Sequence, residues 1–226
     1  MPSAHNTTNT PMVLNKKKMK KFSGNVKFMP HRQNLLGAVK ASNPKICIEL
    51  GCAWGDHVDK ILEILNPDEM YMVDAWEPVP SYNKEYEEFL KNGVNEDESV
   101  YLKILEKYSD NDNVKIIRDF STNLGKEYDF PDNYFDFIYI DTDHTYTTTK
   151  KELNLWFPKL KVGGYIGGDD FFKPMGLEGG KGSAHPVRFA VEEFSAEHQP
   201  IGDIALPFNV WADTKLDSSW LMRKVR

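Results

Sequence analysis

The sequence contains little cysteine and no long apolar run. Only two of its 226 residues are cysteines, and they belong to no cysteine and histidine cluster with zinc spacing, which excludes a disulfide scaffold and a zinc module. No apolar run approaches the roughly 18 residues of a membrane span, and the N-terminus lacks the apolar core of a signal peptide. We therefore expect a cytoplasmic protein with no membrane span.

Acidic residues are missing from the first 48 positions, which hold nine lysines and arginines. Glu49 is the first acid, and the remaining 19 basic residues share the rest of the chain with all 34 acidic ones. We predict a basic, disordered tail over residues 1–22 and a single domain over residues 23–226. An arm for nucleic acid or an anionic membrane is the alternative. The acidic body disfavours a phosphate backbone as ligand and favours small substrates.

Short apolar runs alternate with amphipathic stretches along the chain. Strands are predicted over residues 46–50, 70–73, 114–117, 135–140, 164–166, 204–213 and 217–225. Helices are predicted over residues 31–42, 58–65, 83–109, 145–160 and 186–196. Residues 173–183 are too rich in glycine for regular structure and form either a lid or a surface loop. This alternation is typical of an α/β fold, here a Rossmann-like, doubly wound, mostly parallel seven-stranded sheet with helices on both faces and an antiparallel C-terminal hairpin.

Acidic residues stand at the ends of the first five predicted strands. They are Glu49, Asp74, Asp119, Asp141 and the pair Asp169 and Asp170. Ligands of open parallel sheets bind at the carboxyl ends of the strands, so we expect these carboxylates to line one ligand-binding edge. Each of them taken singly is also compatible with capping the following helix.

The segment after the first strand, ELGCAWG over residues 49–55, is a glycine turn that opens a helix. It is not the G-x-G-x-x-G fingerprint of dinucleotide-binding proteins, and its acid suits a cationic ligand better than a pyrophosphate. Asp74 follows 23 residues beyond Gly51, a spacing at which a carboxylate accepts both hydroxyls of a ribose. Together the two features predict a ribose-bearing cofactor.

At this point the sequence resembles the class I S-adenosylmethionine-dependent methyltransferases. Residues 49–55 look like the first motif of that family, E/D-x-G-x-x-x-G. The segments YIDTDHTY over 139–146 and LKVGGYIGGDDF over 160–171 are similar to a small-molecule O-methyltransferase branch, which includes macrolide-sugar and cephalosporin-biosynthesis methyltransferase-like proteins and, more distantly, catechol O-methyltransferase. The resemblance covers about residues 45–225.

The resemblance implies S-adenosyl-L-methionine as cofactor and a divalent cation, Mg²⁺ above all. Its implied cofactor-binding residues are Glu49, Gly51, Ala53, Trp54, Gly55, Asp74, Ala75, Trp76, Asp119, Phe120, Ser121 and Asp141. Its implied metal ligands are Asp141, Asp169 and Asp170. Three carboxylates provide the hard oxygen donors that magnesium prefers. The alternative is that Asp169 and Asp170 only cap the following loop and order Lys173 or Arg188.

His144, three residues after Asp141, is the candidate general base, because an imidazole can accept a hydroxyl proton at neutral pH. Its structural alternatives are capping the helix that starts at Thr145 or binding Asp143. His57 and His185 are weaker candidates. With Asp141 as the second catalytic residue, the sequence predicts an enzyme that moves a methyl group to a hydroxyl of a small-molecule acceptor.

Two other functions stay open at this stage. One is a non-catalytic scaffold that binds the cofactor, and the other is a nucleic-acid methyltransferase guided by the basic N-terminus. Nucleic acid is the less favoured substrate, because the sequence has no tetrapeptide of the Asn-Pro-Pro-Tyr type. Residues 76–110 and the N-terminal helix offer a face for a homodimer.

Overall fold

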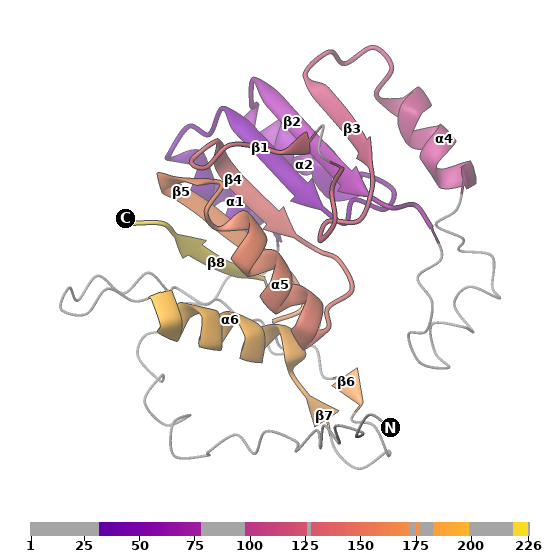
Figure 1. The fold of residues 1–226 in the computed structure, drawn as a ribbon. Coiled ribbons are helices and arrows are strands. Elements are labelled where there is room, and N and C mark those ends of the chain that lie inside the picture. The colour runs from indigo at the N-terminus through magenta and orange to yellow at the C-terminus, as the bar shows by residue number, and fades with distance from the viewer. Residues whose placement is uncertain are drawn as a thin grey trace, which may run out of the picture.

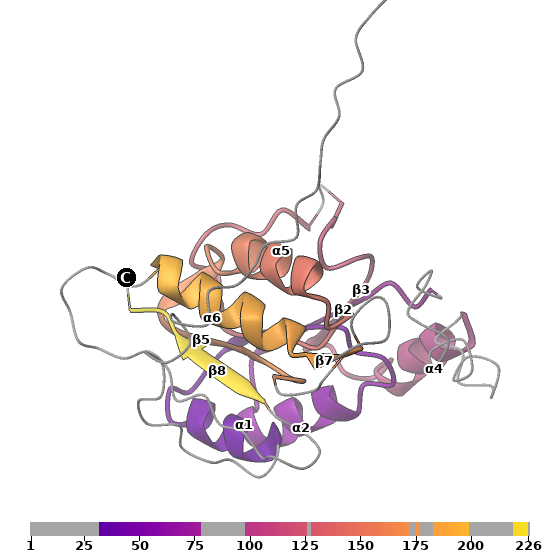
Figure 2. The same cartoon turned by 90° about the horizontal axis from the view of Figure 1, so that it is seen from below.

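The apolar runs of the sequence form the strands of one twisted sheet between two helical layers (Figures 1 and 2). The computed structural model describes residues 32–77, 98–125, 128–171, 175–176, 183–198 and 219–225. Its elements are α1 (Arg32–Lys40), β1 (Ile46–Leu50), α2 (Asp56–Leu65), β2 (Glu69–Asp74), α4 (Glu98–Lys107), β3 (Val114–Arg118), β4 (Phe135–Ile140), α5 (Tyr146–Trp156), β5 (Leu160–Gly168), β6 (Met175–Gly176), β7 (Ser183–Ala184), α6 (Pro186–His198) and β8 (Trp220–Arg223). None of the helices in these ranges is long and apolar enough to cross a membrane.

The main sheet has the order β3-β2-β1-β4-β5-β8. The first five of these strands are parallel, and β8 pairs antiparallel with β5. The chain therefore builds outward from β1 to β3 and then returns to place β4 on the other side of β1. Such a reversal is the position where open α/β sheets bind their ligands. The predicted Rossmann-like α/β class is confirmed.

Successive strand residues face opposite layers, which explains why the strands are apolar on both faces. In β1, Cys47 packs with α1, α2 and α4, whereas Ile48 and Leu50 pack with α5 and α6. Figure 2 shows α1 and α2 on one side of the sheet and α5 and α6 on the other. Leu35, Leu36 and Val39 hold α1 in this core with at most 1% of their surface exposed.

Two boundaries differ from the sequence prediction. Leu160, assigned to the helix of residues 145–160, is instead the first residue of β5. Helix α5 ends earlier because Pro158 has no N–H to continue the hydrogen bonding, although the C-cap residue Phe157 still has a right-handed helical conformation. The second difference is that β6 and β7 pair antiparallel inside the segment predicted to have no regular structure.

The sixth predicted strand, over residues 204–213, lies outside the described residues, as do the tail of residues 1–22 and most of the predicted lid. The described main sheet has six strands. Trp156 and Trp220 are buried in the core. Both cysteines are free and buried.

Candidate active site

Backbone hydrogen bonds extend the sheet one residue beyond its strands and align the acidic strand ends. Asp119 N donates to Asp74 O (3.0 Å) and Gly51 N donates to Val73 O (2.8 Å). On the other side, Asp141 N donates to Leu50 O (2.8 Å) and Asp169 N to Ile140 O (3.3 Å). The structure thus brings the predicted residues after β1 to β5 to one edge of the sheet.

The turn after β1 packs directly against the end of β4. Gly51 has a φ of +84°, and a Cβ atom there would lie 2.1 Å from the carbonyl oxygen of Asp141. Gly55 has a φ of +73°, and its Cβ would meet the Tyr108 hydroxyl at 2.7 Å. The family resemblance implies both glycines as cofactor-binding residues. Contacts within the protein already require both of them.

Asp74 holds the two cofactor-motif segments together. Its Oδ2 accepts a hydrogen bond from Ala53 N (2.9 Å), and its Oδ1 accepts one from Trp76 N (2.8 Å). The indole of Trp76, which is buried, donates to Ala53 O (3.0 Å). Burial raises the pKa of Asp74, while the backbone donors lower it. Trp54 is 39% exposed, so the two flanking tryptophans lie in different environments.

Glu49 is a buried carboxylate beneath this turn. It is 1% exposed, and its Oε2 lies 3.2 Å from Nδ1 of His57 in an ion pair whose geometry is too poor for a hydrogen bond. The His57 ring packs on Tyr139, with 4.1 Å between ring centroids. His57 is therefore a core residue.

The loop after β3 is fixed by two acids, of which the sequence marked only one. Asp119 accepts hydrogen bonds from Phe120 N (2.7 Å) and Gly125 N (3.0 Å). Glu152 of α5 is fully buried and accepts from the hydroxyls of Ser121 and, at 3.0 Å, Thr142. It therefore ties the loop after β3 to the loop after β4.

Glu152 was not among the predicted site residues, because an acid in a helix usually faces solvent. The signal that marks it is its position in the apolar stripe of α5. It stands between Thr149, Leu153 and Trp156, all of which are buried.

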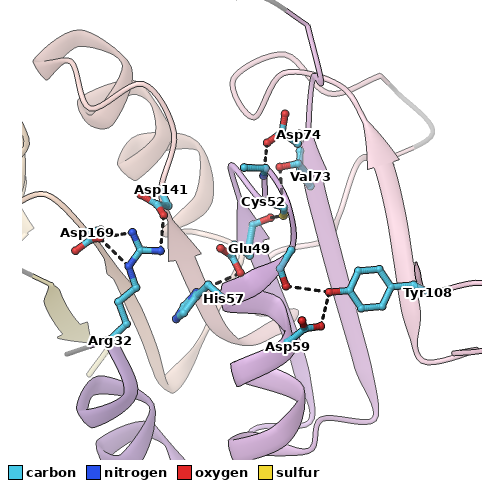
Figure 3. Close-up of polar contacts among 12 residues, drawn as sticks. Arg32, Glu49, Cys52, His57, Asp59, Val73, Asp74, Tyr108, Asp141 and Asp169 are labelled. Atoms are coloured by element: carbon cyan, nitrogen blue, oxygen red, sulfur yellow. Dashed lines mark hydrogen bonds and ion pairs between the residues drawn. The ribbon is translucent and has the colours of Figure 1, made fainter. Parts of the chain in front are cut away.

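Asp141, Asp169 and Asp170, here termed the carboxylate cluster, follow β4 and β5. One guanidinium bridges two of them: Arg32 Nη1 lies 2.9 Å from Asp141 Oδ2, Nε lies 2.7 Å from Asp169 Oδ2, and Nη2 also pairs with Asp169 (Figure 3). The carboxylate of Asp170 lies 3.2 Å from Nε2 of His144, which is 3.8 Å from Asp141 Oδ1. The cluster thus carries three acids beside one arginine and one histidine.

Burial raises the pKa of Asp141 well above its usual range. The positive charge of Arg32 opposes that shift, and the neighbouring acids, above all Asp169, add to it. A perturbed acid in contact with a histidine at the carboxyl edge of the sheet is typical of a functional site.

Two structural alternatives for these residues can now be judged. Thr145 is the N-cap of α5, because its side chain accepts a hydrogen bond from Thr148 N, so His144 does not cap this helix. The basic side chain that Asp169 orders is Arg32, from the acid-free N-terminal segment. His144 and Asp170 both have a positive φ (58° and 56°), a conformation that L-residues adopt at some cost.

The donor chemistry of the carboxylate cluster fits a hard divalent cation, since all three members offer oxygen. Asp141 and Asp169 lie close enough to share one cationic group. In the part of the chain that the structure describes, no group of three or more His, Cys, Asp or Glu side chains is arranged to hold a metal ion.

A comparison with protein families identifies the chain. Residues 48–171, more than half of its length, match the family described as "Methyltransferase domain". The chain belongs to this family. The resemblance to class I S-adenosylmethionine-dependent methyltransferases and the prediction of an enzyme are thereby confirmed.

Solved structures share the fold of this methyltransferase at low sequence identity. The O-methyltransferase NovP matches with 20% identity and a TM-score of 0.59 over 86% of this chain and 78% of NovP. The SAH-bound methyltransferase PaMTH1 of Podospora anserina matches with 18% identity and a TM-score of 0.50 over 84% and 76% of the two chains. An rRNA methylase from Streptococcus thermophilus matches with 13% identity and a TM-score of 0.52 over 88% and 100%. No curated protein sequence matched the chain. At these identities the structures show a common fold.

Proposed function

We propose that this methyltransferase transfers a methyl group from S-adenosyl-L-methionine to a hydroxyl group of a small-molecule acceptor, assisted by a divalent cation. The observation that supports this proposal best is that His144 contacts the carboxylate cluster. This contact lies at the same edge of the sheet as the cofactor-motif segments that follow β1 to β3. A proton acceptor, three oxygen donors and a cofactor site in one place are what metal-assisted O-methylation requires.

The proposed cofactor site consists of the strand-end residues that match the family motifs. They are Glu49, Gly51, Ala53, Trp54, Gly55, Asp74, Ala75, Trp76, Asp119, Phe120, Ser121 and Asp141. The carboxylate of Asp74, held by the backbone N–H groups of Ala53 and Trp76, is the acceptor that we propose for the ribose hydroxyls. The buried charge of Glu49 favours a positively charged ligand nearby. When bound, S-adenosyl-L-methionine supplies the methyl group on its sulfonium.

The proposed acceptor site lies at the carboxylate cluster. The imidazole of His144 accepts the proton of the acceptor hydroxyl, and the carboxylates of Asp170 and Asp141 stabilise the positive charge that the ring then carries. Asp141, Asp169 and Asp170 hold the cation, with Mg²⁺ the best fit to oxygen donors. That cation supplies positive charge that lowers the pKa of the acceptor hydroxyl.

Binding and turnover of two variants test this proposal. Asp74→Asn removes a charged acceptor, so the Kd for S-adenosylhomocysteine in calorimetry should rise about tenfold or more. Asp68→Asn is the matched control, because this acid is exposed and pairs only with Lys45 among the contacts described. His144→Gln should lower kcat by about 10²-fold or more with hydroxylated sugars or phenols while leaving that Kd unchanged.

Each part of the proposal can fail separately. Unchanged binding by Asp74→Asn contradicts the ribose assignment, and turnover that survives a chelator contradicts the cation. Cofactor binding without transfer to any acceptor indicates a scaffold, and methylation of RNA alone indicates the nucleic-acid alternative.

We also propose that the enzyme works in the cytoplasm and forms a homodimer. The support for a dimer is the predicted face over residues 76–110, where Leu102 and Leu105 of α4 are exposed apolar side chains. Light scattering in solution distinguishes a dimer from a monomer.

A further inference from the structure

Arg32 is the first residue of α1, yet it pairs with acids more than a hundred positions away in sequence. Its guanidinium lies between the ends of β4 and β5 and contacts both Asp141 and Asp169 (Figure 3). The side chain of Asp169 is only 1% exposed, so a cation is needed to compensate its charge. The planar fork of arginine suits such a two-acid contact.

The oxygens that Arg32 occupies are those that a metal ion would need. Both oxygens face the guanidinium: Oδ2 of Asp141 lies 2.9 Å from Nη1, and Oδ2 of Asp169 lies 2.7 Å from Nε. Oδ1 of Asp169 accepts a hydrogen bond from Ser219 at 3.3 Å. Because Mg²⁺ binds oxygen at about 2.1 Å, a guanidinium and a metal cannot use the same lone pairs, and their like charges repel.

Arg32 can leave this position without unfolding α1. Its side chain is 36% exposed, whereas the helix is anchored by the buried Leu35, Leu36 and Val39. Rotation of the arginine side chain into solvent therefore opens the cluster while the rest of the helix stays packed. In the closed state the guanidinium of Arg32 compensates the charge of the acids, and in the open state a divalent ion does so.

We propose that Arg32 and the divalent cation are alternative occupants of the carboxylate cluster, so that Arg32 sets the affinity of the site for the cation. This inference rests on the cation-binding part of the proposed function. It assigns to the acid-free N-terminal segment a role at the site: its first described residue competes with the metal. Cation binding would then release the Arg32 side chain from Asp141 and Asp169.

Titration of the full chain with Mn²⁺, followed by the electron paramagnetic resonance signal of the free ion, tests the competition. Arg32→Gln should bind Mn²⁺ about tenfold or more tightly than the wild type, because the competing charge is gone. Lys40→Gln is the matched control, since it removes the same charge from the exposed other end of α1, and its Kd should stay within about twofold of the wild type. Asp169→Asn should abolish binding.

A thermal melt of each variant shows whether it is folded. Arg32→Gln leaves two acids without their partner, so its Tm should fall without Mn²⁺ and recover when the ion is added. The Tm of Arg32→Lys without Mn²⁺ should lie between those of Arg32→Gln and the wild type. An Mn²⁺ affinity of Arg32→Gln equal to or weaker than that of the wild type overturns the competition and leaves the proposed function standing. Failure of every form to bind Mn²⁺ overturns both the competition and the cation, and calorimetry with S-adenosylhomocysteine then tells whether the cofactor site survives.

Discussion

At the scale of single residues, the site depends on buried polar side chains whose partners come from distant segments. Asp74 could be predicted from its spacing to Gly51, because both belong to one strand-turn-helix-strand unit. Arg32 could not, because nothing local distinguishes a helix-starting arginine from a solvated one, and Glu152 is marked only by its position in the apolar stripe of α5. Their roles follow from the sheet order, which brings their partners within reach.

Glu152→Gln should flatten the pH dependence of stability. Burial raises the pKa of Glu152 to about 8, although its two hydroxyl partners lower it. The folded protein then keeps a proton that the unfolded chain loses near its ordinary pKa of 4.5. The stability that this group contributes is complete below that value and is lost as pH rises through about 8, by up to about 1.4 kcal/mol per pH unit.

Urea unfolding at pH 5.5 and pH 8.0 measures this effect. The wild type should lose stability over that interval, and Glu152→Gln should lose less. Glu106→Gln is the control, because Glu106 is exposed on α4. Equal losses in the wild type and in Glu152→Gln would show that the carboxyl group is ionised throughout.

At the scale of elements, the strands were the most predictable part. Runs such as 46–50 and 135–140 are apolar on both faces and end at acids, and the structure forms strands over those same residues. Leu160 was misassigned because it continues the apolar pattern of α5, and only residues 157–159 separate the two elements. The pairing of β6 with β7 joins residues on either side of a glycine-rich segment, a contact that composition alone does not reveal.

The start of α5 offers a test at this scale. The Thr145 hydroxyl accepts from Thr148 N (3.2 Å) and donates to Asp143 (3.0 Å), so it caps the helix and holds the loop that carries His144. Thr145→Ala should lower the free energy of unfolding by about 1 kcal/mol. Thr147→Ala, at an exposed position of the same helix, should change it much less. Chemical denaturation compares the two, and equal losses would contradict the capping role.

At the scale of the whole molecule, the bulk acidity of the chain is partly local. The acids at the ends of β1 to β5 gather at one edge, where a sulfonium and a divalent cation are the proposed ligands. The sheet reversal between β1 and β4 places the cofactor segments and the carboxylate cluster on neighbouring strands. The identity of the acceptor is not encoded in this part of the fold, because the same sheet serves methyltransferases with different substrates.

Ligand binding should therefore stabilise the molecule as a whole. S-adenosylhomocysteine at about 100 times its Kd adds about 2.7 kcal/mol to the free energy of unfolding. For a chain of this size, that corresponds to a Tm increase of roughly 5–10 °C. Differential scanning fluorimetry measures the increase, with NAD⁺ as the control because residues 49–55 lack the dinucleotide fingerprint. A Tm that does not respond to S-adenosylhomocysteine would count against the cofactor site.

The two buried thiols have a practical consequence for following this enzyme in solution. Burial raises the pKa of both Cys47 and Cys52, so neither presents a reactive thiolate to a labelling reagent. The sequence has no other cysteine. A cysteine introduced at the exposed Lys40 would therefore accept a fluorophore or spin label selectively, and the native thiols would not have to be removed first.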